Sequence, residues 1–343
     1  MQEKWFVARP PLPEDRPLHP RHGIHAPTGG TPPRAPGSVR RTSTVDAIRP
    51  RGVNGELVLV GRARDLVTPI DGAAFVHAEA AVRAEVDFMN GRALTRIDAD
   101  PALPGADALL GVPCSTGFRA AVDGIVPQGS ERLSPLYLLL DDLPAASLVS
   151  GHAVIYAGMF PVQEQAQRLQ QPDLCSGWRT GGTILADIDS TGLSPVVTGP
   201  LAPSLLNARD PLAWHTFGPL PANSMRRSRR MDVARTEAIE VDMLFRDSHF
   251  SFAGVETVIH EYTVHARLEP GSLRIIDIAA EPRALPFVEC PEAAASAKRL
   301  AGELVAGLRP RIRAEFLGPS TCTHLNDTLR SLEDVRALAA LLG

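Results

Sequence analysis

The sequence predicts an α+β protein built from two tandem repeats, each a curved, mostly antiparallel sheet packed with helices. Two observations support this fold class. Strand-like segments followed by helical segments occur twice along the 343 residues. Short stretches of the first half also recur in the second half at a nearly constant spacing. We expect the two copies to pair face to face as a pseudo-dimer, because a single copy would need a partner to cover the same surface.

Proline-rich segments divide the chain. Residues 1–37 are rich in Pro and Gly, so we expect an irregular N-terminal arm that buries little surface. Residues 191–224 carry many prolines and no clear periodicity, which is typical of a linker. The first repeat then spans 38–190 and the second repeat spans 225–343.

Within the first repeat, period-two alternation predicts strands, and Asn90-Gly91 predicts a turn between two of them. The predicted strands are 56–65, 74–86, 93–99, 154–159 and 183–188, and the predicted helices are 116–125 and 136–149. The second repeat has the same order of elements. Its predicted strands are 238–246, 256–268 and 273–279, and its predicted helices are 291–315 and 325–342.

Two long matches indicate the repeat. Residues 40–46 correspond to residues 226–232, which lie 186 positions on (226 − 40). GSERLSPLYLLLDDL, from Gly129, corresponds to GPSTCTHLNDTLRSL, from Gly318, which lies 189 positions on (318 − 129). A small drift in spacing is expected where loops differ in length between two copies of one fold.

The copies differ in their reactive residues. Three polar residues of the second copy correspond to apolar ones in the first: Cys322 to Leu133, His324 to Pro135 and Asp327 to Leu138. The first copy keeps His77, which corresponds to His260 at a spacing of 183 (260 − 77). A helix cap would need neither a thiol nor an imidazole, so this difference predicts one working site per chain, with a degenerate site in the first copy.

Charge and cysteine usage narrow the class of function. The net charge is −4 and the pI is about 6.2, which argues against nucleic-acid or membrane partners. Four dispersed cysteines without a CxxC pair indicate a reducing cytoplasm. We expect no apolar run near the roughly 18 residues of a membrane span and no signal peptide. The basic cluster at 226–230 is expected to be solvated rather than to contact a carboxylated substrate.

The segment 322–327, Cys-Thr-His-Leu-Asn-Asp, packs a thiol, an imidazole and a carboxylate into six residues. A turn is predicted before it and a helix after it. His324 and Asp327 are three apart and therefore share a helix face. Cys322 would lie at the positive end of the helix, where a thiolate is favoured. The plainer alternative is a capped helix with an ordinary buried cysteine.

The predicted strand 256–268 carries a second set of candidates. Its even positions are mostly apolar, so alternation places His260 and Tyr262 on the inward face beside Val258 and Val264. A buried imidazole must find a hydrogen-bond partner. A lone inward histidine is more often a satisfied core residue than a catalyst, but Tyr262 on the same face favours a site.

These residues together resemble a bacterial family, domain of unknown function 2889. The resemblance covers about residues 225–335 and rests on Asp247, Ile259-His260-Glu261, Cys290-Pro291 and Cys322-Thr323-His324-Leu325 with Asp327. The first copy, about 38–150, matches more faintly. Residues 173–178 resemble the tail that follows the Cys-Thr-His-Leu motif in single-domain members. The resemblance implies candidate residues and no reaction.

We favour a small-molecule enzyme without an organic cofactor, a lyase or isomerase of secondary or aromatic metabolism acting on a largely apolar carbonyl or phenolic compound. His324 would be the general base, oriented by Asp327. His260 or Tyr262 would be the acid or the oxyanion donor. Cys322 would be a nucleophile or a packing residue. No Gly-rich phosphate loop stands out, so a nucleotide cofactor is not expected.

Two alternatives stay open. In the first, His260, Cys322 and His324 bind zinc or another divalent transition metal in a hydrolase or lyase, with the fourth position open. In the second, the protein binds a small-molecule ligand without turning it over. A homo-oligomer is possible in each case. All three hypotheses place the same residues around one pocket: His260, Tyr262, Cys322 and His324, with Asp247 approaching from the neighbouring strand.

Overall fold

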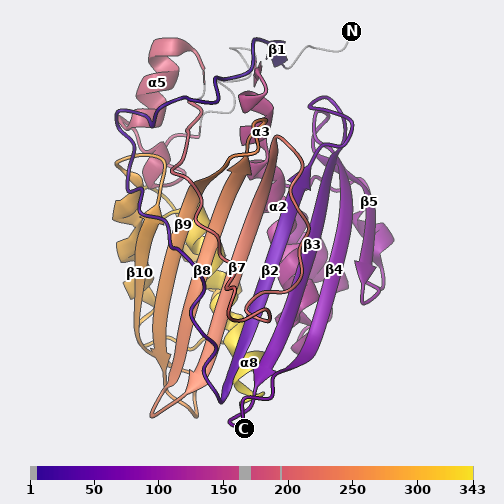
Figure 1. Cartoon of the computed structure of the whole chain (residues 1–343), viewed down its shortest axis with the longest axis vertical. Coiled ribbons are helices and arrows are strands. Elements are labelled where there is room, and N and C mark those ends of the chain that lie inside the picture. Colours follow the sequence, from indigo (N-terminus) through magenta and orange to yellow (C-terminus); the bar gives the residue numbers. More distant parts are fainter. Residues whose placement is uncertain (1–5, 162–170, 194, 343) are drawn as a thin grey trace.

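The computed structural model describes residues 6–161, 171–193 and 195–342. These residues form one large antiparallel sheet with helices on one face, so the predicted α+β class is confirmed (Figure 1). In spatial order the eight strands are β10 (Ile275–Ala284), β9 (Glu256–Leu268), β8 (Ile239–Phe250), β7 (Ser224–Arg235), β2 (Ser38–Ile48), β3 (Leu57–Thr68), β4 (Phe75–Asp87) and β5 (Ala93–Asp100). A separate two-stranded ribbon pairs β1 (Phe6–Ala8) with β6 (Met159–Pro161).

The helices lie mainly behind the strands in Figure 1, on one face of the sheet, whereas α3 (Gly151–Tyr156) and α5 (Thr183–Thr191) lie beyond the upper ends of the strands. The other helices are η1 (Ala106–Leu109), α1 (Phe118–Ile125), η2 (Ser130–Leu133), α2 (Pro135–Val149), η3 (Ser176–Trp178), η4 (Cys290–Leu300), α6 (Leu308–Glu315), α7 (Thr323–Arg330), η5 (Ser331–Asp334) and α8 (Val335–Ala339). Helix α2 packs on β2, β3 and β4, whereas α8 packs on β7 and β2. Two apolar cores result, one under each half of the sheet.

The two halves meet edge to edge, so the expectation of face-to-face pairing is wrong. Strands β2 and β7 are hydrogen-bonded along most of their length, from Ser38 opposite Ala234 to Ala47 opposite Met225. Each half would otherwise leave one long strand with unpaired backbone groups. Joining the two edges satisfies those groups and makes a single sheet.

Three predicted elements are wrong. Residues 154–159 mostly belong to helix α3, and residues 183–188 lie in helix α5. Both are short apolar runs, for which period alone does not separate a strand from a buried helix. The predicted helix 291–315 is divided into η4 and α6 by a loop with two glycines at positive φ, Gly302 and Gly307.

The N-terminal arm and the linker cross the other face of the sheet, in front of the strands in Figure 1. Arginines of the sheet hold their irregular backbones. Arg40 donates to the carbonyl of Pro32, and Arg246 donates to those of Thr28 and Pro203. This face of the sheet is therefore covered by irregular segments whose carbonyls are hydrogen-bonded to it.

The basic cluster at 226–230 is not solvated. Its four arginines are buried, and each is paired with an aspartate. On the outer face, Arg226 pairs with Asp46 at 2.6 Å. On the helix face, Arg227 pairs with Asp247, and Arg229 pairs with Asp142 of α2. The cluster therefore ties the centre of the sheet to the layers on both of its faces.

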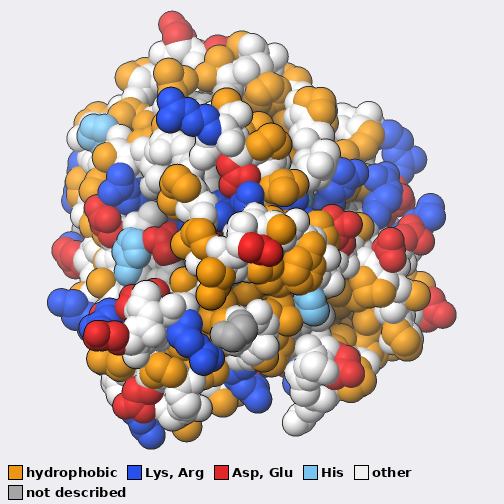
Figure 2. All heavy atoms as spheres, turned by 60° about the horizontal axis from the view of Figure 1, so that its bottom comes forward, with side chains coloured by type: hydrophobic (Ala, Val, Ile, Leu, Met, Phe, Trp, Pro, Cys, Tyr) orange, Lys and Arg blue, Asp and Glu red, His pale blue; other side chains and the backbone are white. Residues whose placement is uncertain are grey.

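Within the part of the chain that the structure describes, one helical segment, Pro135–Tyr156, is long and apolar enough to cross a membrane, contrary to our expectation of no such run. Most of it is buried within the molecule, as in the core helix of a globular fold. At one end of the molecule, Figure 2 shows basic and acidic side chains in small mixed groups between apolar ones. That face is of mixed charge rather than basic.

We predict that Arg229→Met lowers the free energy of unfolding by about 3 kcal/mol, because it leaves the buried Asp142 carboxylate without its bidentate partner. Urea unfolding followed by circular dichroism measures the loss. Arg267→Met is the matched control, because Arg267 forms exposed ion pairs with Glu240 and Asp277. Equal urea midpoints for the two variants would contradict a structural role for the buried pair.

Candidate functional site

The candidate site lies where β8 and β9 meet the first turn of α7. Asp247 of β8 is directly opposite His260 of β9 in the sheet register. A β-bulge follows at once, because Ser248 pairs with Val258 and leaves Ile259 as the extra residue. Bulges re-aim side chains next to sites. Here the cross-strand pair brings a carboxylate and an imidazole to the same place under α7.

The His324 imidazole lies on that of His260. The two ring centroids are 3.6 Å apart and the planes differ by 17°. Nε2 of His324 is 3.7 Å from Oδ2 of Asp247, and Nδ1 of His260 is 4.0 Å from the same oxygen. Both distances exceed hydrogen-bond length. Two nitrogens and one carboxylate oxygen therefore converge without bonding one another.

Nδ1 of His260 is buried and has no hydrogen-bond partner among the described residues. Such an atom carries a desolvation cost that most native structures avoid. The surroundings of His260 also shift its pKa. Burial and the neighbouring His324 hold the pKa of His260 well below its usual range, and burial lowers the pKa of His324 to about 3. Both imidazoles are therefore neutral at pH 7.

Cys322 lies on the other side of the His324 ring. Its Sγ is 3.8 Å from Nδ1, while Nε2 faces Asp247. The positive helix end does not make it a thiolate, because burial raises its pKa to about 12. The thiol can hold the imidazole in place from Nδ1 and leave Nε2 turned toward the carboxylate.

Asp327, which we expected to orient His324, instead forms ion pairs with Arg119, Arg227 and Arg330. These buried cations hold the pKa of Asp327 well below its usual range against the opposing effect of burial. The carboxylate that faces the imidazoles is Asp247, which is fully buried and is itself held by Arg227 through two bonds of 2.9 Å. Sequence reasoning missed Arg227, although it stands on the strand next to Asp247.

A cavity of about 80 Å³ opens beside the two imidazoles. His260, His324 and Cys322 line it, together with Cys175 and Cys290. The pKa of each of these three thiols is raised by burial. The cavity is therefore lined by neutral imidazoles and protonated thiols.

Tyr262 is fully buried two residues beyond His260, and its hydroxyl has no hydrogen-bond partner among the described residues. Burial and the adjacent Cys322 raise its pKa well above the usual range. The inward direction predicted for Tyr262 and Val264 holds, because both side chains belong to the apolar core of the second half. The prediction is wrong for Val258, because the bulge at Ile259 pairs it with Ser248 and so turns it to the opposite face from His260. Tyr262 belongs to the wall behind Cys322 rather than to the lining of the cavity.

The tail at 173–178 forms the outer wall of this cavity, although it precedes the motif by almost half the chain. The backbone N–H of Ser176 donates to the carbonyl of Thr321 at 2.8 Å, and its hydroxyl donates to the carbonyl of Glu289. Gly177 passes so close to Cys290 that an added Cβ would lie 2.9 Å from its Sγ. Any larger residue at this position would therefore displace the Cys290 side chain.

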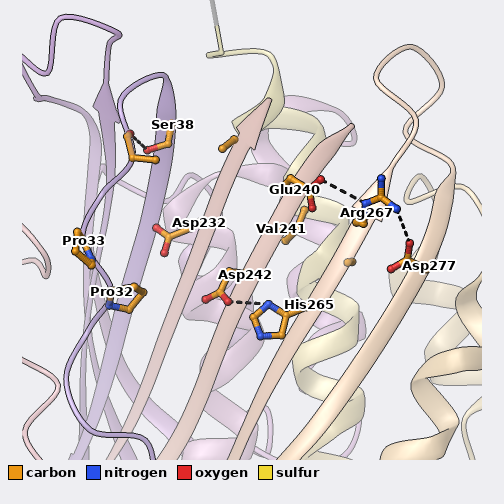
Figure 3. Close-up of a pocket in the computed structure, with 13 residues that line it drawn as sticks. Pro32, Pro33, Ser38, Asp232, Glu240, Val241, Asp242, His265, Arg267 and Asp277 are labelled. Atoms are coloured by element: carbon orange, nitrogen blue, oxygen red, sulfur yellow. Dashed lines mark hydrogen bonds and ion pairs between the residues drawn. The ribbon is translucent and has the colours of Figure 1, made fainter. Parts of the chain in front are cut away.

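A larger cavity of about 400 Å³ lies on the opposite face of the sheet (Figure 3). Its carboxylates are already paired within the protein. Asp242 binds His265, and Arg267 joins Glu240 to Asp277. None of the sequence-predicted site residues lines it. The smaller cavity beside His260 and His324 is therefore the better candidate site.

Comparison with known proteins gives one match. No curated protein and no solved structure matches the chain. The region from β7 to α8, which supplies Asp247, His260, Cys322 and His324, does match a family model. Residues 225–338 match the family described as Protein of unknown function (DUF2889), the family that the motifs of the second half resemble.

Proposed function

We propose that the chain is a small-molecule enzyme whose site holds one divalent transition metal ion, with Asp247, His260 and His324 as ligands. The main support is the convergence of three ligand atoms, which all lie within 4.8 Å of one another. Cys322, which the sequence placed among the ligands, gives way to Asp247 in this set. Two histidines and one carboxylate leave open positions on an ion, as catalytic zinc and non-haem iron sites do.

The distances fit an ion of ordinary size. Metal bonds of about 2.1 Å at a tetrahedral angle separate two ligand atoms by roughly 3.4 Å, and a wider angle separates them further. The observed 3.7 and 4.0 Å lie in the range that one ion can bridge. Because a lone pair lies in the plane of its ring, the stacked imidazoles must splay for both to reach the same ion. Binding would also satisfy the orphaned Nδ1 of His260.

Each residue around the ion would have a separate role. Oδ2 of Asp247 accepts from Arg227 and retains a second lone pair for an ion. Cys322 holds Nδ1 of His324. The ion would supply Lewis acidity or a water activated near neutral pH. A cavity of about 80 Å³ accommodates that water and one small polar group, which suits a hydrolase or lyase acting on a compact substrate.

Acid–base chemistry by a lyase or isomerase is the second candidate. The contact between Cys322 and His324 favours it, because a thiol and an imidazole in reach of each other can exchange a proton. A general base works best with a pKa near the working pH, however, and burial lowers the pKa of His324 to about 3. A phenolic substrate would also need more room than about 80 Å³. We therefore rank the metal site first.

We predict that the purified protein binds one equivalent of Zn²⁺ or Co²⁺ after dialysis against a chelator. His260→Ala and His324→Ala should each weaken binding by at least about 100-fold, because each removes one of three ligands. Isothermal titration calorimetry measures the affinity and elemental analysis the stoichiometry. His265→Ala is the matched control, since this exposed histidine of the same strand pairs with Asp242 away from the site.

Turnover then separates the two candidates. Metal-loaded protein would be assayed with a panel of small esters, amides and hydroxy acids. Activity that disappears with the metal and returns on reloading supports the first candidate. A rate that survives chelation would overturn the ranking in favour of acid–base catalysis.

We also infer that the two halves are tandem copies of one unit. Two ion pairs across the β2–β7 seam support this: Arg40 binds Asp232 and Arg226 binds Asp46. A two-fold operation that exchanges residue 40 with 226 and residue 46 with 232 exchanges these pairs, as in an isologous dimer. In β3 a bulge follows Asp65 just as one follows Asp247 in β8.

This register changes one assignment. Opposite Asp65 stands Ala78, whereas opposite Asp247 stands His260. The counterpart of His260 is therefore Ala78, and His77 is the extra bulge residue, with its side chain exposed. With Pro135 in place of His324, the first copy would lack both imidazoles.

We predict one ion per chain rather than two, because only the second copy carries the ligands. His324→Ala should abolish activity while thermal unfolding stays near that of the unaltered protein, since the first copy folds with Pro135 at that position. His77→Ala should retain the ion and most activity. Equal losses from the two substitutions would sink the one-site hypothesis.

A further inference from the structure

The cavity of about 80 Å³ beside the two imidazoles has an uncharged lining. Among the described residues, no Lys, Arg, Asp or Glu lines it. Three of the four cysteines of the chain do: Cys175 of the tail, Cys290 of η4 and Cys322 before α7. A thiol packs as a small apolar group with only a weak S–H donor. Most of the remaining wall is apolar, and it includes Leu174, Trp178, Ile184, Leu285 and Pro286.

The buried cation nearest to the candidate ligands is already used by the protein. Arg227 donates to Asp247 through two bonds of 2.9 Å. Its remaining terminal nitrogen donates to Asp142 and Asp327. A carboxylate or phosphate group inside the cavity would therefore lose its water without gaining a cationic side chain. Burial of a charge without a partner is strongly unfavourable.

The volume limits the size of a group that can enter. An apolar cavity of about 150 Å³ holds benzene, which has six non-hydrogen atoms. In proportion, a cavity of about 80 Å³ holds about three or four such atoms. The wall is tight at Gly177, where an added Cβ would lie 2.9 Å from Sγ of Cys290. The Cys290 thiol therefore has little room to move aside for a longer group.

We propose that the substrate enters this cavity with an uncharged acyl or alkyl group of about three or four non-hydrogen atoms, counting the polar atom that meets the ion. The thiols and apolar side chains would surround the rest of the group, and Cys290 would limit its length. An apolar group gains free energy on leaving water, whereas an ionised group loses it. The inference rests on the proposed function for its reaction, but the preference of the cavity can be measured without the ion.

The first probes are acetone and acetate, which have equal numbers of non-hydrogen atoms and differ in charge. Each is titrated into the full chain after dialysis against a chelator, and ligand-observed NMR measures the affinity. We expect acetone to bind at least about tenfold more tightly than acetate, because acetate must bury its charge. Butan-2-one is longer by one methylene and should bind more weakly than acetone.

Cys290→Ala assigns the binding to this cavity, because removal of the sulfur makes room for the extra methylene. It should raise the affinity for butan-2-one relative to acetone by about tenfold, the usual effect of one methylene in an apolar pocket. The affinity for Zn²⁺ should stay unchanged, since Cys290 is outside the set of converging ligands. Cys114→Ala is the matched control, because this thiol is buried in the core of the first half and should leave the ratio unchanged.

Two results would overturn the proposal. One is equal binding of acetone and acetate, or no saturable binding of acetone up to about 0.1 M, the affinity of a poor ligand of this size. The other is an equal effect of Cys290→Ala and Cys114→Ala on the preference between the two ketones.

The outcome for the ion is separate. Acetone binding that responds to Cys290→Ala, in a protein that takes up no Zn²⁺, would support the cavity preference and refute the metal site. Uptake of Zn²⁺ by a protein that binds acetone and acetate alike would refute the preference and leave the metal site standing.

Discussion

The arrangement of the molecule depends on one buried guanidinium, Arg227. It binds Asp247 with two hydrogen bonds, and it also reaches Asp142 of α2 and Asp327 of α7. Arg227 is thus the centre of an ion-pair network that neutralises three carboxylates, each from a different element. A buried ion pair stabilises little by itself, but loss of one member leaves the others uncompensated. The helices and the sheet are therefore held in one relative position, and Asp247 is fixed where the imidazoles meet it.

The alternation of apolar residues predicted much of the site on β9. Alternation placed His260 and Tyr262 on the inward face, where Tyr262 lies in the core and His260 lies against His324 at the cavity. The short motif likewise led to Cys322 and His324 at the start of α7. The carboxylate beside His324 was not predictable in this way. Spacing along a helix pointed to Asp327, but Arg330 of the same helix, Arg119 of α1 and Arg227 of β7 occupy that carboxylate. Only the sheet register selects Asp247.

The fold was predictable to a similar depth. Long alternating segments such as β4 and β9 gave their own boundaries within a residue or two. Short apolar runs such as α5 were not predicted correctly, since burial in the tertiary structure decides whether they form a helix or a strand. The edge-to-edge seam also escaped prediction, because its partners are nearly two hundred positions apart. The signal for the seam was the matching Arg and Asp positions of residues 40–46 and 226–232, because Arg40 pairs with Asp232 and Arg226 pairs with Asp46 across it.

The tail at 173–178 crosses from the end of the first half onto the site of the second. The family match begins only at residue 225, so the matched span lacks one wall of its own cavity. If single-domain relatives exchange tails between subunits, the same wall would come from a neighbouring chain. If the two halves are tandem copies, as we infer, the chain makes that intermolecular wall an internal one, and the first half serves as scaffold for the site of the second.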